Sequence, residues 1–382
     1  MSARHSFDTI LIGGGAMGSS AAWQLAARGQ RVLVLDRFRP PHPHGSTHGE
    51  TRVIREAYFE HPAYVPLVQR AYDLWRELER QTGKSLLRIT GGLMIGPPEG
   101  VVFNGARTSA EQHGLPHEIL EAGEIQRRFP ALRIPEQLQA VLEPRAGILM
   151  VEACVAAGLE AAAHHLARLH FDEPAISWRA TTGGVEVVTD RGVYSAGQLV
   201  LAAGAWLAQL LPQLATNLRV ERQVLHWFQP TRAPELHAPD RLPVHVVEYE
   251  AGRFFYALPD VGTGVKAALH HQGATVSPDA VDREVTKDEQ AGMGRLAGGY
   301  LPGLAPMPHE SVTCLYTNTP DEHFLIDHHP QHAQVLIVSP CSGHGFKFAS
   351  AIGEVVADLV TTGKSRLDLS LFKLDRLGGP PT

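Results

Sequence analysis

The sequence predicts an α/β protein with two domains, one of them discontinuous. The chain begins with a strand–turn–helix–strand unit, has several strand-like runs between Val220 and Lys266, and ends with a second strand–turn–helix unit. Because alternating strands and helices form parallel sheets, we assign residues 1–85, 145–215 and 318–382 to one domain. Residues 86–144 and 216–317 are assigned to a second domain, built on a mixed or antiparallel sheet.

The first 36 residues contain a dinucleotide-binding unit. A buried strand over residues 7–12 is followed by "GGGAMG", in which Gly13, Gly15 and Gly18 satisfy G-x-G-x-x-G. These glycines allow a tight turn, close approach of a pyrophosphate and close packing of the next helix on the strand. A second strand ends at Asp36, at the spacing expected for a partner of the ribose hydroxyls. The unit predicts a Rossmann-like domain that binds FAD or NAD.

Composition excludes several classes of protein. The chain has 382 residues, a net charge of −6 and no long basic run, so nucleic acid is not an expected partner. No apolar run is long enough to span a bilayer, and the first strand begins too early to leave room for a signal peptide. Three cysteines cannot all pair, which favours a reducing, cytoplasmic location. We expect no metal site, because the histidines form no H-x-x-x-H pattern on a convincing helix.

The segment after the first unit is an irregular loop rich in proline, glycine and histidine. It delivers Arg52 and Arg55 three residues apart, which predicts one side of a helical turn. The two cations could form a solvated basic pair, or they could face a flavin or a carboxylate. The following run, residues 64–78, has apolar residues at helical spacing and is interpreted as a core helix.

Later segments return the chain to the first domain. Residues 147–165 are interpreted as a helix, and the next two runs as a hairpin that ends in "VLAAGAW". Near the end, "QVLIVSP" predicts a strand, "CSGHGFKFAS" a turn and "AIGEVVADLV" a helix. This turn would present Gly343, Gly345 and nearby backbone N–H groups to a ring system, with Lys347 at the helix start.

Cys314 has two interpretations from the residues alone. Most free cysteines are small buried hydrophobes, and Cys154, in an alanine-rich helical run, is interpreted in that way. Cys314 could instead be a covalent attachment point.

Five stretches carry a resemblance to a known family. They are "GGGAMGSSAAWQLAARG", "PPHPHGSTHGETRVIREAY", "GVKAALH", "CLYTNTPDEHFLID" and "SGHGFKFAS". The chain resembles the monomeric sarcosine oxidase and N-methyltryptophan oxidase group of the D-amino-acid-oxidase-like FAD enzymes. The stretches are spread over nearly the whole chain, and "HGETRVIR" with "SGHGFKF" is far more specific than the glycine motif. The resemblance selects FAD over NAD and implies an FAD-binding and a substrate domain.

The resemblance implies roles for individual residues. Cys314 matches the cysteine that carries the flavin through a thioether to its 8α-methyl carbon. Arg55 and Lys347 match the pair that binds the substrate carboxylate. Lys266 matches the lysine at the flavin face where oxygen is reduced. The remaining matches are His270 and Tyr256 beside the substrate, and Arg52 and His48 near the flavin.

The resemblance also implies a set of FAD-binding residues, with departures from the family pattern. Two positions depart from the family pattern: Thr47 replaces one histidine of a pair, and Cys341 replaces a bulkier apolar residue. The residues expected to bind FAD are Gly13, Gly15, Gly18, Asp36, Arg37, Ser46, His48, Arg52, Cys314, Gly343, Gly345 and Lys347.

The resemblance implies an amine oxidase. Its expected reaction oxidises the C–N bond of an N-methyl amino acid such as sarcosine, giving an imine that hydrolyses to an aldehyde while O2 becomes H2O2. Cyclic imino acids such as pipecolate or proline, and N-methyltryptophan, are alternative substrates. A nicotinamide-dependent dehydrogenase would not explain Cys314, and a non-catalytic flavoprotein would not need Arg55, Lys266 and Lys347. We expect a monomer whose partners are a secondary amine with a carboxylate and O2.

Overall fold

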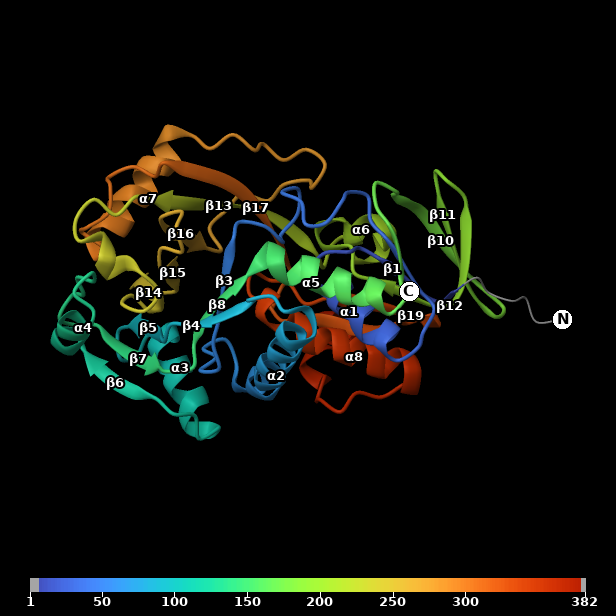
Figure 1. The fold of residues 1–382 in the computed structure, drawn as a ribbon, viewed down its shortest axis with the longest axis horizontal. Helices are drawn as coiled ribbons and strands as arrows, with labels where there is room; N and C mark the ends of the chain where they lie inside the picture. Colours follow the sequence, from blue (N-terminus) through green and yellow to red (C-terminus); the bar gives the residue numbers. More distant parts are fainter. Residues whose placement is uncertain (1–6, 379–382) are drawn as a thin grey trace.

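A computed structural model describes residues 7–378 and shows an elongated molecule with two lobes (Figure 1). The lobe on the right of the view contains one large sheet with helices on it, and the left lobe contains a second large sheet. A small sheet lies between them. Among residues 7–378, no helix has both the length and the apolar character needed to cross a bilayer.

The first sheet contains the strand–turn–helix units at both ends of the chain. Its strands are β1 (Phe7–Ile12), β2 (Val32–Leu35), β9 (Arg168–His170), β10 (Ala175–Thr181), β11 (Gly184–Thr189), β12 (Val193–Leu201), β18 (Leu325–His329) and β19 (His332–Ser339). The order β9-β2-β1-β12-β19 is parallel throughout, which confirms the predicted dinucleotide-binding fold. Ile12 pairs with Leu35 and with Leu201, so three strands end at one edge of the sheet.

Helices from three parts of the chain pack beside one another on this sheet. They are α1 (Ala16–Ala27), α5 (Val151–His164), α8 (Ala349–Thr362) and, packed across α5 and α8, α2 (Val65–Thr82). Small residues allow the close contact: a Cβ atom at Gly353 would lie 2.5 Å from the backbone carbon of Ser20. The predicted apolar stripe from Val65 to Leu78 is buried along α2, which confirms that helix.

The second sheet is mixed, as predicted. Its strands are β5 (Gly92–Gly96), β6 (Glu118–Glu121), β7 (Gln139–Glu143), β13 (Arg219–Phe228), β14 (Val244–Glu250), β15 (Arg253–Leu258), β16 (Val265–His270) and β17 (Glu310–Asn318). The order is β17-β13-β16-β15-β14-β5-β7-β6, and β14 with β5 is its parallel pair. Its lobe also carries α3 (Val101–Gln112), α4 (Ala122–Arg128) and α7 (Lys287–Tyr300), while α6 (Leu207–Leu210) follows β12 in the other lobe.

The small sheet corrects two predictions. It consists of β3 (Thr51–Ile54), β8 (Gly147–Met150) and β4 (Leu87–Ile89). The helical turn predicted for Arg52 and Arg55 is wrong, because residues 51–54 pair with β8 as an antiparallel strand. The helix predicted from Gly147 begins four residues later, since β8 pairs with strands on both sides. A Cβ at Gly147 would lie 2.2 Å from the Arg88 carbonyl oxygen, so glycine permits this contact.

Sheet membership supports the division proposed from the sequence. Strands of the first sheet lie within residues 1–85, 145–215 and 318–382, and those of the second lie within 86–144 and 216–317, apart from the last residue of β17. β4 joins β8 in the small sheet, although residues 86–144 were assigned to the second domain. We retain the two-domain boundaries as a proposal on this basis.

Candidate active site

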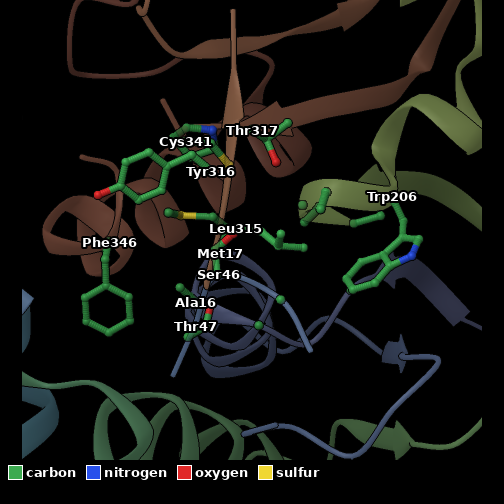
Figure 2. A pocket seen from close by; sticks show the side chains of 18 of the residues that line it. Ala16, Met17, Ser46, Thr47, Trp206, Leu315, Tyr316, Thr317, Cys341 and Phe346 are labelled. Atoms are coloured by element: carbon green, nitrogen blue, oxygen red, sulfur yellow. The ribbon is translucent and has the colours of Figure 1, made fainter. Parts of the chain in front are cut away.

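A long cavity runs from the edge of the first sheet to the face of the second. It begins at the turns after β1 and β2, passes the loop over residues 40–47, and reaches β15, β16, β17 and the turn after β19. Figure 2 shows Trp206 and Phe346 on opposite sides of this cavity, with Met17 and Leu315 between them. Both sheets therefore contribute to one site.

The glycine turn forms a cradle at the first-sheet end. Gly13 has φ of 105°, and a Cβ there would lie 2.3 Å from the Ala202 carbonyl oxygen. A Cβ at Gly18 would lie 1.7 Å from the Gly13 carbonyl oxygen, so the helix can approach the strand only because residue 18 is glycine. Helix α1 follows Gly15, which caps it without a side-chain hydrogen bond. First-turn N–H groups of α1 thus suit an anion such as a pyrophosphate.

Asp36 lies at the end of β2, where the ribose partner was predicted. Its two carboxylate oxygens accept hydrogen bonds from the N–H groups of Gly14, at 2.7 Å, and Phe38, at 2.8 Å. Burial raises the pKa of Asp36. The carboxylate is therefore held in place beside the cradle, and each oxygen retains capacity to accept from a ribose hydroxyl.

A buried hydroxyl without a protein partner lines the middle of the cavity. The hydroxyl oxygen of Ser46 is buried and makes no hydrogen bond to the described chain, whereas the buried Thr317 hydroxyl has the Cys341 thiol beside it. An unpaired buried hydroxyl is costly unless a bound molecule supplies the partner. Arg37, at the first-sheet end, pairs with Asp279 at 3.0 Å, and Asp279 also accepts from the Trp206 indole. The cradle, Asp36 and the unpaired Ser46 hydroxyl fit a bound FAD.

Cys314 lies behind the cavity wall in β17. Its side chain is fully buried, and the cavity is lined by the next three residues of the strand. The Arg52 guanidinium donates to the Cys314 sulfur at 3.5 Å, and the thiol points to the Ser46 carbonyl oxygen at 3.6 Å. A cation in contact with the sulfur can stabilise negative charge that develops there when the sulfur acts as a nucleophile.

Lys266 also lies behind the wall, on β16. Its ammonium donates to the carbonyl oxygens of Gly49, at 2.8 Å, and Thr51. The Gly49 turn is itself held by Glu152, which accepts the Gly49 N–H at 2.7 Å. Burial, reinforced by Arg52, lowers the pKa of Lys266 well below its usual value. The structure thus places Lys266 against the loop that carries Arg52.

Arg55 lines the second-sheet end of the cavity and already has a carboxylate partner. Its guanidinium donates to both oxygens of Glu60, at 2.7 and 2.6 Å, and lies over the rings of Tyr58 and Phe59. Although burial opposes ionisation, the Arg55 charge lowers the pKa of Glu60. One guanidinium nitrogen, Nη2, makes both contacts to Glu60, while Nη1 donates to the Ala57 carbonyl at 3.0 Å, so Arg55 is already paired with one carboxylate.

Lys347 lines the same end and is held by a chain of hydrogen bonds. Its ammonium donates to the His344 carbonyl at 2.8 Å and to the Tyr58 hydroxyl at 3.3 Å. The His344 ring contacts the Glu322 carbonyl through Nε2, at 3.0 Å, and the Tyr58 hydroxyl through Nδ1, at 2.6 Å. Because a carbonyl only accepts, Nε2 carries the ring proton and Nδ1 accepts from Tyr58. Burial, with Arg55 nearby, lowers the pKa of Lys347 to about 7.

Tyr256 and His270 face the cavity from β15 and β16. His270 contacts the Tyr316 hydroxyl through Nδ1 at 3.3 Å, and Phe254 from β15 lines the cavity beside it. Burial, and then the neighbouring His271, lower the pKa of His270 well below its usual value. The histidine at the cavity is therefore neutral.

Some predicted residues lie outside the cavity lining, and some lining residues were not predicted. The predicted residues outside the lining are Gly18, His48, Lys266, Cys314 and Gly345. Glu60 follows Arg55 closely but belongs to no pattern, whereas the lining residues Tyr316 and His344 lie inside two of the quoted stretches and could have been found there. Within residues 7–378, no three His, Cys, Asp or Glu side chains gather as they would around a metal ion.

Comparison with known proteins identifies the family. Residues 8–359 match the DAO family, described as FAD dependent oxidoreductase. The chain is 42% identical over 380 residues to a monomeric sarcosine oxidase of Streptomyces avermitilis, covering 98% of this chain and 99% of that one. It is 35% identical over 372 residues to an N-methyl-L-tryptophan oxidase of Yersinia pestis, covering 97% and 99%.

A solved structure agrees with this comparison. The structure of NikD, described as an unusual amino acid oxidase essential for nikkomycin biosynthesis, superposes with a TM-score of 0.84 at 25% identity, covering 96% of this chain and 97% of that one. The chain therefore belongs to the DAO family of FAD-dependent oxidoreductases, in the group of the monomeric sarcosine oxidases and N-methyl-L-tryptophan oxidases.

Proposed function

We propose that the protein is an FAD-dependent oxidase of N-methyl amino acids such as sarcosine. The observation that carries this proposal is the pair of buried cations, Arg55 and Lys347, at the opposite end of the cavity from the dinucleotide cradle. Two cations facing one space suit a substrate with a carboxylate. The names of the relatives, a sarcosine oxidase and an N-methyl-L-tryptophan oxidase, agree with an amino acid that carries an N-methyl group.

Carboxylate binding requires a change of partner at Arg55. Glu60 accepts from Nη2 of the Arg55 guanidinium, and both side chains line the cavity. A substrate carboxylate would replace Glu60 on Arg55, while Lys347 offers the N–H that its two protein acceptors leave over. This exchange would place the amine end of the substrate toward Tyr256 and His270. A neutral His270 can accept a hydrogen bond from the substrate nitrogen, which a protonated ring cannot do.

FAD held by the cradle and Asp36 would supply the redox chemistry, a two-electron oxidation of the carbon next to the substrate nitrogen with O2 as the final acceptor, giving H2O2. Lys266 would supply a positive charge near the place where oxygen gains an electron, because a fixed cation stabilises a developing anion. Phe59 and Phe254 give this end of the cavity an aromatic, apolar lining.

Covalent attachment through Cys314 is part of this proposal. Forming the thioether would break the S–H bond of Cys314 and one C–H bond of the 8α-methyl group and make one C–S bond; the two protons and two electrons released would reduce O2 to H2O2. The Arg52 guanidinium, 3.5 Å from the sulfur, would stabilise negative charge on the sulfur during this step. Cys341, whose pKa burial raises to about 11, lacks such a cation and is not proposed as an attachment point.

A larger or cyclic amino acid is a second candidate substrate. Phe59, Val246, Phe254 and Tyr256 line the cavity near Arg55, so the surroundings of a substrate side chain are apolar and aromatic. Such a wall favours an N-methyl amino acid with an apolar side chain, or a cyclic imino acid, over a charged one. We further propose that the enzyme acts as a monomer in the cytoplasm, in keeping with the three unpaired cysteines.

The test is a peroxide-release screen. Sarcosine, N-methyltryptophan, pipecolate and proline are each compared with the matching amine that lacks the carboxylate. We expect peroxide from at least one of these amino acids and far less from its decarboxylated counterpart, because Arg55 and Lys347 then have no partner. A flavin-free protein, or equal rates for both members of every pair, would overturn the proposal.

A further inference from the structure

A second histidine stands directly behind His270. His271 follows the end of β16, and its ring centroid lies 4.2 Å from that of His270. The His271 side chain is 17% exposed and does not line the cavity, whereas His270 does. Two imidazolium ions at this distance would repel each other strongly, so the two rings are not expected to be charged together.

Glu221 decides which of the two rings takes the charge. This largely buried carboxylate of β13 lies 3.5 Å from Nδ1 of His271. It also accepts from the Gly273 N–H at 2.6 Å and from the side-chain amides of Gln223 and Asn318 at 2.7 and 2.6 Å. All three of these donors are neutral. A carboxylate fixed by neutral donors keeps its charge and favours a cation beside it.

The other charged group beside His271 acts in the same sense as Glu221: it is Glu322, 3.8 Å from Nε2. The neutral groups around His271 are the Ser342 carbonyl, the Tyr316 ring and the Asn318 side-chain amide, whose nitrogen lies 3.5 Å from Nδ1. Burial disfavours a charge on His271, but Glu221 and Glu322 outweigh it and raise the pKa of this ring. His270 faces cations instead: His271 first, and more distantly Arg55 and Lys347. The nearby His344 ring is neutral, since its Nδ1 accepts from Tyr58.

We propose that His271, protonated and held by Glu221, is a positioning residue that keeps the neighbouring His270 ring neutral at the substrate site. This inference rests on the proposed function, in which His270 accepts a hydrogen bond from the substrate nitrogen. A charged His271 extends the range in which His270 remains an acceptor to lower pH. The His270–His271 pair therefore determines how far the pH can fall before His270 stops accepting a hydrogen bond from the substrate nitrogen.

The test is an NMR titration of the holoenzyme with 15N-labelled histidine rings, from pH 4 to pH 9. His270→Asn and His271→Gln identify the two sets of ring signals. We expect the His271 ring to be protonated at pH 7 in the parent enzyme and the His270 ring to be neutral. A neutral His271 ring at pH 7 would overturn the proposal. This result is read on the parent enzyme, and the two variants serve only to assign the signals.

Two variants test the link between the rings. In Glu221→Gln, His271 should lose its proton by pH 7. In both Glu221→Gln and His271→Gln, the protonation of His270 should move up by about one pH unit, because a like charge within roughly 4–6 Å has been removed. If His270 stays neutral down to pH 4 in both variants, burial alone suffices and the proposal is wrong.

Kinetics give a second readout. The KM of the substrate identified in the peroxide screen should rise up to about tenfold at the acidic end in His271→Gln, which is the effect of a one-unit shift. His170→Gln removes a histidine paired with Glu173 in the first sheet and should keep the parent profile. A protein purified without flavin would refute the proposed function, whereas the ring titration, read on the histidines themselves, decides the inference separately.

Discussion

Carboxylate binding should depend on pH through Lys347. Burial lowers the pKa of this lysine to about 7 in the free enzyme, so it is charged below that pH and increasingly neutral above it. A bound carboxylate favours the charged form and raises the pKa again. Affinity for a simple carboxylate such as acetate should therefore be greatest below pH 7 and should fall as the pH rises from 7 to 9.

The size of the effect follows from the contacts. The Lys347 ammonium has two protein acceptors, the His344 carbonyl and the Tyr58 hydroxyl, which leaves one N–H for the ligand. One charge-assisted hydrogen bond is worth about 1.5–3 kcal/mol. This corresponds to roughly ten- to a hundredfold in affinity. Above the pKa of Lys347 in the free enzyme, the affinity for acetate should fall by at most about tenfold per pH unit, so the whole decrease should be complete within roughly two pH units.

The assay follows the flavin absorbance while acetate is added at pH 6, 7, 8 and 9. Lys347→Met should bind weakly at every pH, and Lys347→Arg should keep a charge and show a flat profile over this range. Lys266→Met is the matched control, a second buried lysine whose removal should leave the slope unchanged. A flat profile in the parent enzyme, or the parent slope in Lys347→Met, would refute the assignment of Lys347 as the titrating cation.

Three further predictions concern other parts of the site. Lys266→Met should slow the reaction of reduced enzyme with oxygen far more than anaerobic reduction, as stopped-flow kinetics can show, and equal loss in both steps would make this lysine structural. Acid precipitation should leave yellow colour in the protein pellet, while Cys314→Ala should release any flavin that it binds; colour released from the parent would exclude the thioether. Glu60→Gln should bind acetate more tightly, about tenfold, because the ligand no longer displaces a charged partner from Arg55. Unchanged or weaker binding in acetate titrations would show that Glu60 does not compete for Arg55.

Local sequence determined the dinucleotide half of the protein. The glycine turn, the strand before it, the helix after it and Asp36 lie within one continuous stretch, and their spacing leaves few backbone solutions. The motif alone gives the reason for Gly13 and Gly18, and the structure agrees, since a side chain at either position would collide with the backbone. The same holds for the buried stripe of α2, whose period is set by helix geometry.

The substrate half was decided by tertiary structure. Arg55 was predicted as a carboxylate-binding cation, but nothing in the sequence shows that Glu60 occupies its guanidinium. Arg52 was expected on a helical turn, yet its segment becomes a strand because residues 147–150, almost a hundred positions later, supply the hydrogen-bonding partners. Pairing between distant strands depends on which strand edges are available in the folded protein, and the local propensity of a segment does not contain this information.

Charge states depended most on the tertiary fold. His270 and His271 are adjacent in sequence and identical in chemistry, but β13 brings Glu221 to one of them and the cavity receives the other. Lys347 and Lys266 likewise have lowered pKa values because surrounding elements remove water from each. Desolvation and long-range charge pairs are properties of the assembled interior, so a sequence can nominate these residues but only the fold sets how they ionise.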